Sequence, residues 1–164
     1  MIARHASLLL LTILLSITTP AAQNASPSKV PPPEILGVRL GTPYATAHSQ
    51  LAKLGQLQKE AEGQEVWTLL GDEHYQFLIV GFDAERRVRY VTAIADAGGT
   101  PLRFEDIGDL GRATRTGQPG NLTLTWKADD PKSKIEYVAI AKGKDVQRLS
   151  SLSVKRLGAK AEED

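Results

Sequence analysis

The chain has no cysteine among its 164 residues, and aromatic side chains make up only 5% of it. The absence of thiols excludes disulfides, thiolate catalysis, zinc sites built on cysteine and a lipid attached through an N-terminal cysteine. Neither charge sign dominates, since Lys and Arg total 20 and Asp and Glu total 19. A nucleic-acid partner is therefore not expected, because such proteins present a marked excess of basic residues.

The chain also lacks an apolar run of the ~20 residues that a membrane-spanning helix needs. Its longest apolar run, Ser7 to Ile17, is shorter, follows Arg4 and His5, and precedes the small residues 19–22. This pattern predicts a secretory signal peptide over residues 1–22, cleaved after Ala21 or Ala22. The alternative is a signal that stays uncleaved as an anchor. Cleavage predicts a secreted or periplasmic protein with no stable membrane span.

The composition then divides the rest of the chain. Residues 23–33 are rich in proline and poor in apolar side chains, which predicts an extended linker. We expect a first folded half over 34–97, a second over 98–157, and a charged tail over 158–164. The fold class expected for the two halves is α+β, with a layer of helices packed on an antiparallel sheet.

The segment around residues 42–55 predicts an amphipathic helix. Thr42 is a suitable N-cap, Pro43 a suitable first helical residue, and Gly55 a suitable left-handed terminator. Apolar and aromatic residues recur at helical spacing and mark the face that should be buried. These residues are Tyr44, Ala47, His48, Leu51 and Leu54.

Short β-branched and apolar runs separated by polar turns predict an antiparallel meander in each half. The expected strands cover 64–70, 75–82 and 88–95, then 121–128, 134–141 and 146–157. Residues 56–63 are polar and are interpreted as a loop or a frayed end of the helix. A short helix is expected over 101–110, with Leu102, Ile107 and Leu110 toward a core.

The two halves resemble each other, which predicts an internal duplication of an αβββ unit. Trp67 corresponds to Trp126, each in the first strand of its half. The run 77–80 corresponds to 137–140, and Val88 corresponds to Leu149, each following a charged hairpin at the start of the last strand. The implied repeat of roughly 60 residues is longer than the periods of solenoid proteins. The alternative is chance agreement between two generic strand patterns.

The segments Gly37-Val-Arg-Leu-Gly-Thr-Pro43 and Leu51-Ala-Lys-Leu-Gly55 resemble the opening of the beta-lactamase-inhibitor-protein-like superfamily. The outer-membrane assembly lipoproteins of similar fold begin in the same way. The resemblance implies a helical layer on a small antiparallel sheet, in tandem copies, and a protein-binding role. The chain departs from both groups because it has neither the lipid-attachment cysteine nor the disulfides, and because it is poor in aromatics.

No group of residues in the sequence predicts catalysis, a cofactor or a metal site. His48 lies on the apolar face of the expected helix, and the adjacent residues Asp72, Glu73 and His74 in a turn cannot all point inward as ligands. The serines near residue 150 lack the context of a nucleophile elbow. We therefore predict no catalytic, cofactor-binding or metal-binding residues.

The strongest functional indication is a sheet that is apolar on both faces while helices are expected on only one. The uncovered face would then be a binding surface, and its candidate residues are Trp67, Trp126, Tyr90 and Arg89. The alternative is that both faces are buried. A modest local excess of arginine favours either an anionic partner or lipid headgroups or, more simply, charges that keep hairpin tips soluble and sheet edges unpaired. It consists of Arg86, Arg87, Arg89, Arg103, Arg112 and Arg115.

The favoured hypothesis is an exported, non-enzymatic module that binds another extracytoplasmic protein. One alternative is a carrier with a cavity for a small ligand or lipid. A further alternative is an enzyme of unfamiliar type, which would require Asp72, His74 and Arg89 to meet in space. The oligomeric state stays open.

Overall fold

The computed structural model describes residues 30–61 and 63–158. The predicted signal peptide, most of the linker and nearly all of the tail lie outside these residues. The elements are β1 (Glu34–Ile35), β2 (Val38–Arg39), α1 (Tyr44–Leu54), β3 (Gly55–Ala61), β4 (Gln64–Leu69), β5 (Tyr75–Phe82), β6 (Val88–Ala95), α2 (Phe104–Ile107), the 3₁₀ turn η1 (Leu110–Arg112), β7 (Thr114–Gln118), β8 (Asn121–Asp130), β9 (Ile135–Asp145) and β10 (Arg148–Arg156).

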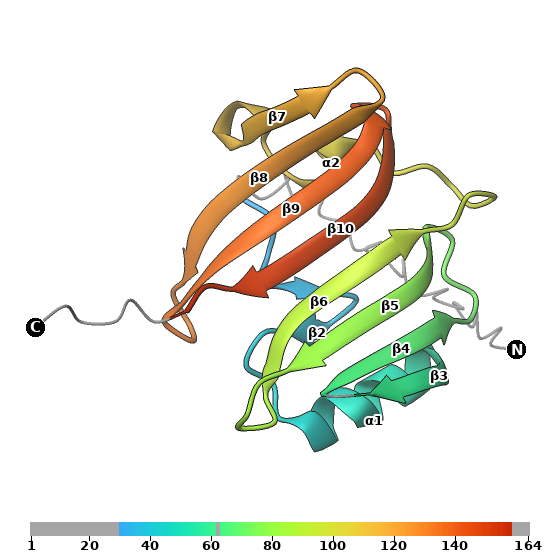
Figure 1. Cartoon of the computed structure of the whole chain (residues 1–164), viewed down its shortest axis with the longest axis vertical. Helices are drawn as coiled ribbons and strands as arrows, with labels where there is room; N and C mark the ends of the chain where they lie inside the picture. Colours follow the sequence, from blue (N-terminus) through green and yellow to red (C-terminus); the bar gives the residue numbers. More distant parts are fainter. Residues whose placement is uncertain (1–29, 62, 159–164) are drawn as a thin grey trace, which may run out of the picture.

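Eight strands form one antiparallel sheet in the order β3-β4-β5-β6-β10-β9-β8-β7 (Figure 1). The last strands of the two meanders, β6 and β10, pair with each other and form the seam between them. The expected antiparallel sheet is confirmed. The expected helix layer is present only in part, because α1 has 11 residues and α2 only four. Most of the described residues are in strands.

The helix α1 forms where its apolar spacing predicts, and Ala47 and Leu51 are fully buried. Both predictions about its ends are wrong. Pro43, not Thr42, occupies the N-cap position, because the backbone of Thr42 is used in hydrogen bonds to Arg39 and Val88. Gly55 is extended rather than left-handed, and the chain runs directly from the helix into β3.

The need for glycine at position 55 has another cause. A Cβ there would lie 2.0 Å from the carbonyl oxygen of Thr68 in the neighbouring strand β4. Only glycine allows the chain to leave the helix and pair with β4 at once. The interpretation of 56–63 as a loop is therefore wrong, since these residues belong mainly to edge strand β3.

The second half begins with a shorter helix than predicted. Only residues 104–107 are α-helical, and Phe104 is the side chain that is fully buried. Leu110, expected in the core, is 38% exposed at the start of η1. The edge strand β7 follows, and all of its residues are exposed.

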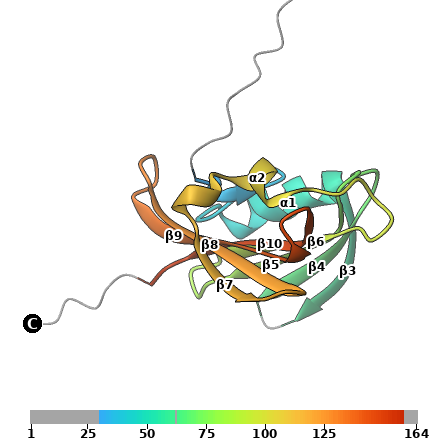
Figure 2. The same ribbon diagram turned by 90° about the horizontal axis from the view of Figure 1, so that it is seen from above.

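The helices α1 and α2 and the small β1–β2 hairpin lie on the same side of the sheet (Figure 2). We call the sheet face toward them the covered face and the opposite one the open face. Two rows of buried side chains cross the covered face from one meander to the other. One row is Trp67, Leu78, Ala93, Leu152, Ala141 and Leu124, and the other is Glu65, Val80, Val91, Val154, Ala139 and Trp126.

The two rows show which positions of one meander correspond to which positions of the other across the seam. Register places Trp67 beside Leu78, and it places Trp126 beside Ala139. The second strands therefore correspond through Leu78 and Ala139. This correspondence is shifted by one position from the match between the runs 77–80 and 137–140 that the sequence suggests. The duplication itself stays a prediction.

The folded unit begins earlier than the predicted end of the linker. Pro31 is fully buried, and its carbonyl oxygen accepts a 2.7 Å hydrogen bond from the hydroxyl of Tyr137. The carbonyl of Pro33 accepts from the amide of Leu40. Pro31 and Pro33 are thus buried against the fold, while Pro32 between them is exposed. Within the described residues, the helices are too short and too polar to cross a bilayer.

Candidate binding surfaces

The two tryptophans do not lie on an exposed face. Trp67 is 3% exposed and Trp126 is 1% exposed, and both point into the covered face beneath the helices. Their indole N–H groups are satisfied internally, by Glu65 at 2.9 Å and by the carbonyl of Asp109 at 2.9 Å. Their assignment to a binding face is therefore wrong, since a side chain buried this far cannot contact a partner.

Tyr90 does lie on the open face. Its ring covers Gly81 on the neighbouring strand, where a Cβ would come within 2.0 Å of the ring, and its hydroxyl donates to Gln64. Arg89 is exposed at the start of β6, where the strand register slips. Of the four predicted site residues, Tyr90 and Arg89 are thus accessible, and they lie near one end of the seam.

The open face has a partly apolar centre. Val66, Ile79, Thr92, Ser153, Ile140 and Thr125 form one continuous cross-strand row. All six are half-buried, and the hydroxyls of Thr92 and Ser153 meet at 2.9 Å across the seam. Phe77 and Ile94 lie in the next row. A strip of β-branched and aromatic side chains therefore crosses both meanders on the face that the described helices leave uncovered.

Lysines surround this strip. Four exposed lysines lie at positions of their strands that face the open side of the sheet. They are Lys59, Lys127, Lys142 and Lys155. By the same alternation the carboxylates on this face, Asp129 and Glu136, sit at one end of β8 and β9. The rim of the apolar strip is accordingly positive over most of its length.

A second cluster lies where α1 meets β4 on the covered face. The buried carboxylate of Glu65, 1% exposed, lies 2.8 Å from Nδ1 of His48 and accepts from the indole of Trp67. The hydroxyl of Tyr44 lies 3.4 Å from Glu60, and a hydrogen bond to the Glu65 carboxylate is the main cause that raises the pKa of Tyr44. A cavity of about 280 Å³ opens beside these groups.

The cluster orients His48 through its contact with the Glu65 carboxylate. The described residues include no group of three or more His, Asp or Glu side chains that could hold a metal. The residues that sequence reasoning considered for catalysis are also separated. Asp72 caps its own turn through the amides of His74 and Tyr75, at the end of β5 opposite to Arg89. Most of the length of β5, roughly 20 Å, lies between them, so the constellation of Asp72, His74 and Arg89 does not form.

We expect the Glu65 cluster to contribute to stability. Glu65 occupies the position equivalent to Leu124 in the other meander. Glu65→Leu should lower the free energy of unfolding by about 1–3 kcal/mol, because it leaves the Trp67 indole N–H buried without an acceptor. Glu65→Gln keeps an acceptor and should cost less than about 1 kcal/mol. Urea unfolding of both variants measures this, and a Glu65→Leu protein as stable as the wild type would contradict the role assigned to Glu65.

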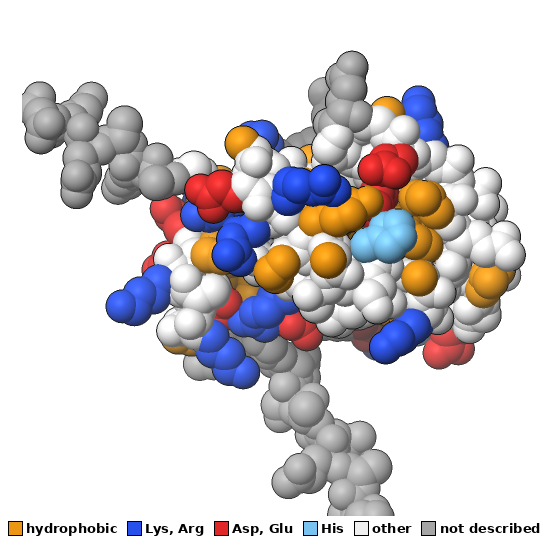
Figure 3. All heavy atoms as spheres, turned by 90° about the horizontal axis from the view of Figure 1, so that it is seen from below, with side chains coloured by type: hydrophobic (Ala, Val, Ile, Leu, Met, Phe, Trp, Pro, Cys, Tyr) orange, Lys and Arg blue, Asp and Glu red, His pale blue; other side chains and the backbone are white. Residues whose placement is uncertain are grey.

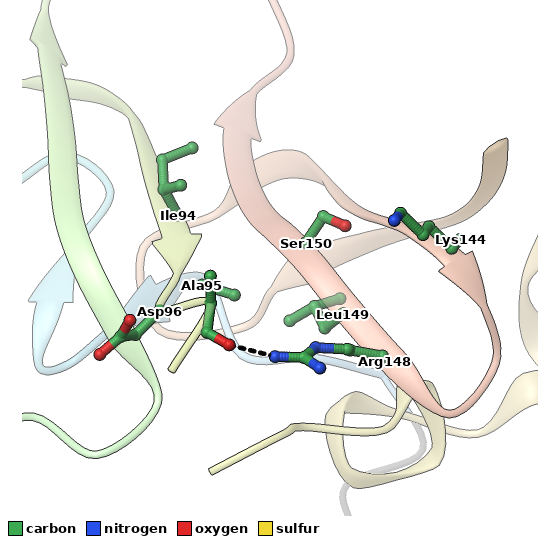
Figure 4. Close-up of a pocket in the computed structure, with 8 residues that line it drawn as sticks. Ile94, Ala95, Asp96, Lys144, Arg148, Leu149 and Ser150 are labelled. Atoms are coloured by element: carbon green, nitrogen blue, oxygen red, sulfur yellow. Dashed lines mark hydrogen bonds between the residues drawn. The ribbon is translucent and has the colours of Figure 1, made fainter. Parts of the chain in front are cut away.

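Another hollow lies at the opposite end of the seam from Arg89. It has a volume of about 500 Å³, and Figure 4 shows Ile94 and Asp96 of the first meander on one side and Lys144, Leu149 and Ser150 of the second on the other. The guanidinium of Arg148 crosses the gap to the carbonyl of Ala97. The hollow exists because β6 and β10 pair only through residues 90–94 and 151–155 and separate beyond them.

Known proteins give no assignment for these surfaces. No protein-family model, no curated protein and no solved structure matches the chain. The resemblance to the beta-lactamase-inhibitor-protein-like superfamily therefore stays a prediction. The assignment of a function has to rest on the surfaces themselves.

Proposed function

We propose that the protein is an exported, non-enzymatic binding module that uses the open face of its sheet to hold another extracytoplasmic protein. The observation that carries the proposal is the half-buried, partly apolar strip through Ile79 and Ile140, which crosses both meanders on the uncovered face. Apolar side chains gathered on a sheet face that the described helices leave uncovered are typical of an interaction site.

The size of the open face supports a protein partner. Eight strands spaced about 4.8 Å apart make a sheet roughly 34 Å wide, and six residues of strand extend roughly 20 Å. The face is therefore of the order of 700 Å², close to the ~800 Å² that each partner buries in a standard interface.

The charges around the strip favour a partner of the opposite sign. A second copy of this chain, docked face to face, would place one lysine-rich rim against another, since the lysines at 59, 127, 142 and 155 are spread around the strip. Like charges placed together at an interface are costly, whereas acidic side chains around an apolar patch would complement the lysines. We therefore propose an acidic protein surface as the partner.

Site-specific photo-crosslinking would test this proposal. A photoreactive residue at position 79, in the centre of the open face, should capture one protein in the native envelope, while the same residue at position 112, in η1, should not. Combining Lys142→Glu and Lys155→Glu should reduce the capture at least tenfold, because two rim charges are reversed. Equal capture from positions 79 and 112, or capture insensitive to the lysine changes, would overturn the proposal.

A carrier function is the alternative that a specific observation favours. The 500 Å³ hollow beside Ile94 and Leu149 combines apolar walls with the cations Lys144 and Arg148. Native mass spectrometry of the exported chain would detect a retained small molecule. A co-purifying ligand lost in Leu149→Lys, with no protein captured from position 79, would favour the carrier.

A further inference from the structure

Arginines from separate parts of the sequence gather at the end of the seam opposite to the hollow in Figure 4. Arg87 and Arg89 come from the β5–β6 turn and β6, and Arg156 comes from the last residue of β10. They meet because β6 and β10 are antiparallel, which places the start of one strand beside the end of the other. Figure 3, which views the molecule from below, shows many basic side chains on the left of the view, with acidic side chains among them.

Two neighbouring hollows are lined by these arginines. One of about 450 Å³ is bounded by Arg39, Arg87 and Arg156, with Glu85 as the acidic residue on its wall. The other, of about 350 Å³, is bounded by Arg89 and Arg156, with Asp83 on its wall. Arg156 lines both hollows, which therefore adjoin at its side chain. We call the two hollows together the arginine groove.

The cations of the groove differ in how far they are neutralised. Arg39 is fully paired, because its guanidinium lies 2.8 Å from the carboxylate of Glu34 and 2.6 Å from that of Asp130. These two ion pairs fix the side chain against the β1–β2 hairpin and the end of β8. Arg39 therefore shapes the wall of the groove and is not available to hold a ligand.

The other three arginines are engaged only in part. Arg87 donates to a backbone carbonyl at 3.1 Å and lies 3.9 Å from Glu85. Arg156 lies 3.6 Å from Asp83, and both ion-pair distances are longer than a charge-assisted hydrogen bond. The side chain of Arg89 makes neither a hydrogen bond nor an ion pair with any described residue.

The carboxylate of Asp83 is itself already engaged. Its Oδ1 accepts from the amides of Glu85 at 3.1 Å and Arg87 at 2.8 Å, which closes the hairpin turn. Part of the negative charge of this carboxylate is therefore compensated by the two backbone amides. Three guanidinium groups, those of residues 87, 89 and 156, are left with N–H donors that the described part of the fold does not satisfy.

We propose that the arginine groove binds a phosphate group. The planar fork of a guanidinium matches two oxygens of a phosphate, and a second fork on the wall of the same hollow can bind a further oxygen. Arg156 shares one hollow with Arg87 and the other with Arg89. Arg156 is the central donor, with Arg89 on one side and Arg87 on the other. The phosphate is carried either by a soluble molecule or by a lipid headgroup. This site is separate from the open-face strip and does not depend on it.

Calorimetric titration of the purified full chain with inorganic pyrophosphate tests the soluble source, and sedimentation with vesicles of phosphatidic acid in phosphatidylcholine tests the lipid source. Arg156→Gln should weaken binding about tenfold or more, because it removes a charge-assisted donor from the centre of the groove. Arg156→Lys should recover only part of it, because lysine lacks the fork. The matched control, Arg112→Gln, removes the same charge from η1 and should change nothing.

The outcomes distinguish a specific phosphate site from general attraction by positive charge. Binding of pyrophosphate, of vesicles or of both that depends on Arg156 supports the site and identifies its source. Binding of neither, or binding that Arg112→Gln weakens as much as Arg156→Gln, overturns it, because general charge would then account for the affinity. The side chain of Arg156 is 39% exposed, so the variant should keep the wild-type unfolding midpoint in urea, which excludes a folding defect as the cause.

Discussion

Trp126→Ala should lower the free energy of unfolding by about 3–5 kcal/mol, one of the largest effects available in this chain. The indole is 1% exposed, contacts Gly108 in the segment after α2, and donates to the carbonyl of Asp109. Its removal opens a cavity beneath the second half's short helix and leaves that carbonyl without its donor. Urea unfolding measures the change. It is monitored by circular dichroism and not by tryptophan fluorescence, because the variant lacks one of the tryptophans.

The matched control is Trp126→Phe. Phenylalanine fills much of the same volume but cannot donate to Asp109, so this change should cost only about 1–2 kcal/mol. A loss below about 1 kcal/mol in Trp126→Ala would show that the contact between α2 and the sheet contributes little. Any loss of binding in Trp126→Ala would report unfolding, which makes the open-face residue Ile79 the appropriate probe of a partner.

The burial of both tryptophans shows where sequence reasoning stops. Alternation along a strand tells which residues share a face, and it groups Trp67 with Leu69 and apart from Val66. It does not tell which face the helices cover. Because both faces of β4 to β6 carry apolar residues, only the packing of α1 and α2 decides that the tryptophan face is the covered one.

The inner strands were predictable because the side chains on one face of each strand are buried, which leaves an alternating pattern in the sequence. The predicted ranges 75–82 and 88–95 coincide with β5 and β6. The edge strands β3 and β7 were missed because they contact the sheet on one side only, and nearly all of their side chains are exposed. Without a buried face there is no alternation of polarity in the sequence to mark a strand.

One part of the Glu65 cluster did leave a signal in the sequence. Glu65 alternates in register with Trp67 and Leu69, so its side chain points to the same face of the strand as theirs. If that face is the buried one, a charged side chain must be buried with them. His48 lies on the apolar face of the expected helix, and the two meet at 2.8 Å. The arginine groove left only part of its signal in the sequence. The local excess of arginine includes Arg87 and Arg89, but Arg156 joins them only through the pairing of β6 with β10.

Asp130→Asn is expected to lower the free energy of unfolding by about 2 kcal/mol at pH 7. Asp130 is 3% exposed and accepts from the hydroxyl of Ser133, from Arg39 at 2.6 Å and from the amide of Lys132. The Ser133 hydroxyl and then Arg39 are the main causes that lower its pKa to about 2. The pair attaches the β1–β2 hairpin to the end of β8, so the carboxylate stabilises the contact between the two halves of the chain.

The pH dependence follows from the direction of this shift. Because the folded protein holds the pKa of Asp130 below its usual value of 3.8, the stabilisation is complete above about pH 4. It is lost as the pH falls through about 2, where the carboxylate becomes protonated in the folded state as well. The stability difference between wild type and Asp130→Asn should therefore shrink from about 2 kcal/mol at neutral pH toward zero in strong acid.

The neighbouring residue Asp129 supplies a matched control. It is exposed, and Asp129→Asn should change the free energy of unfolding by less than about 0.5 kcal/mol at either pH. Urea unfolding of the three proteins across the acid range gives the comparison. A difference for Asp130→Asn that stays constant with pH would mean that it arises from packing and not from the ionised carboxylate. The connection between the hairpin and β8 would then be steric.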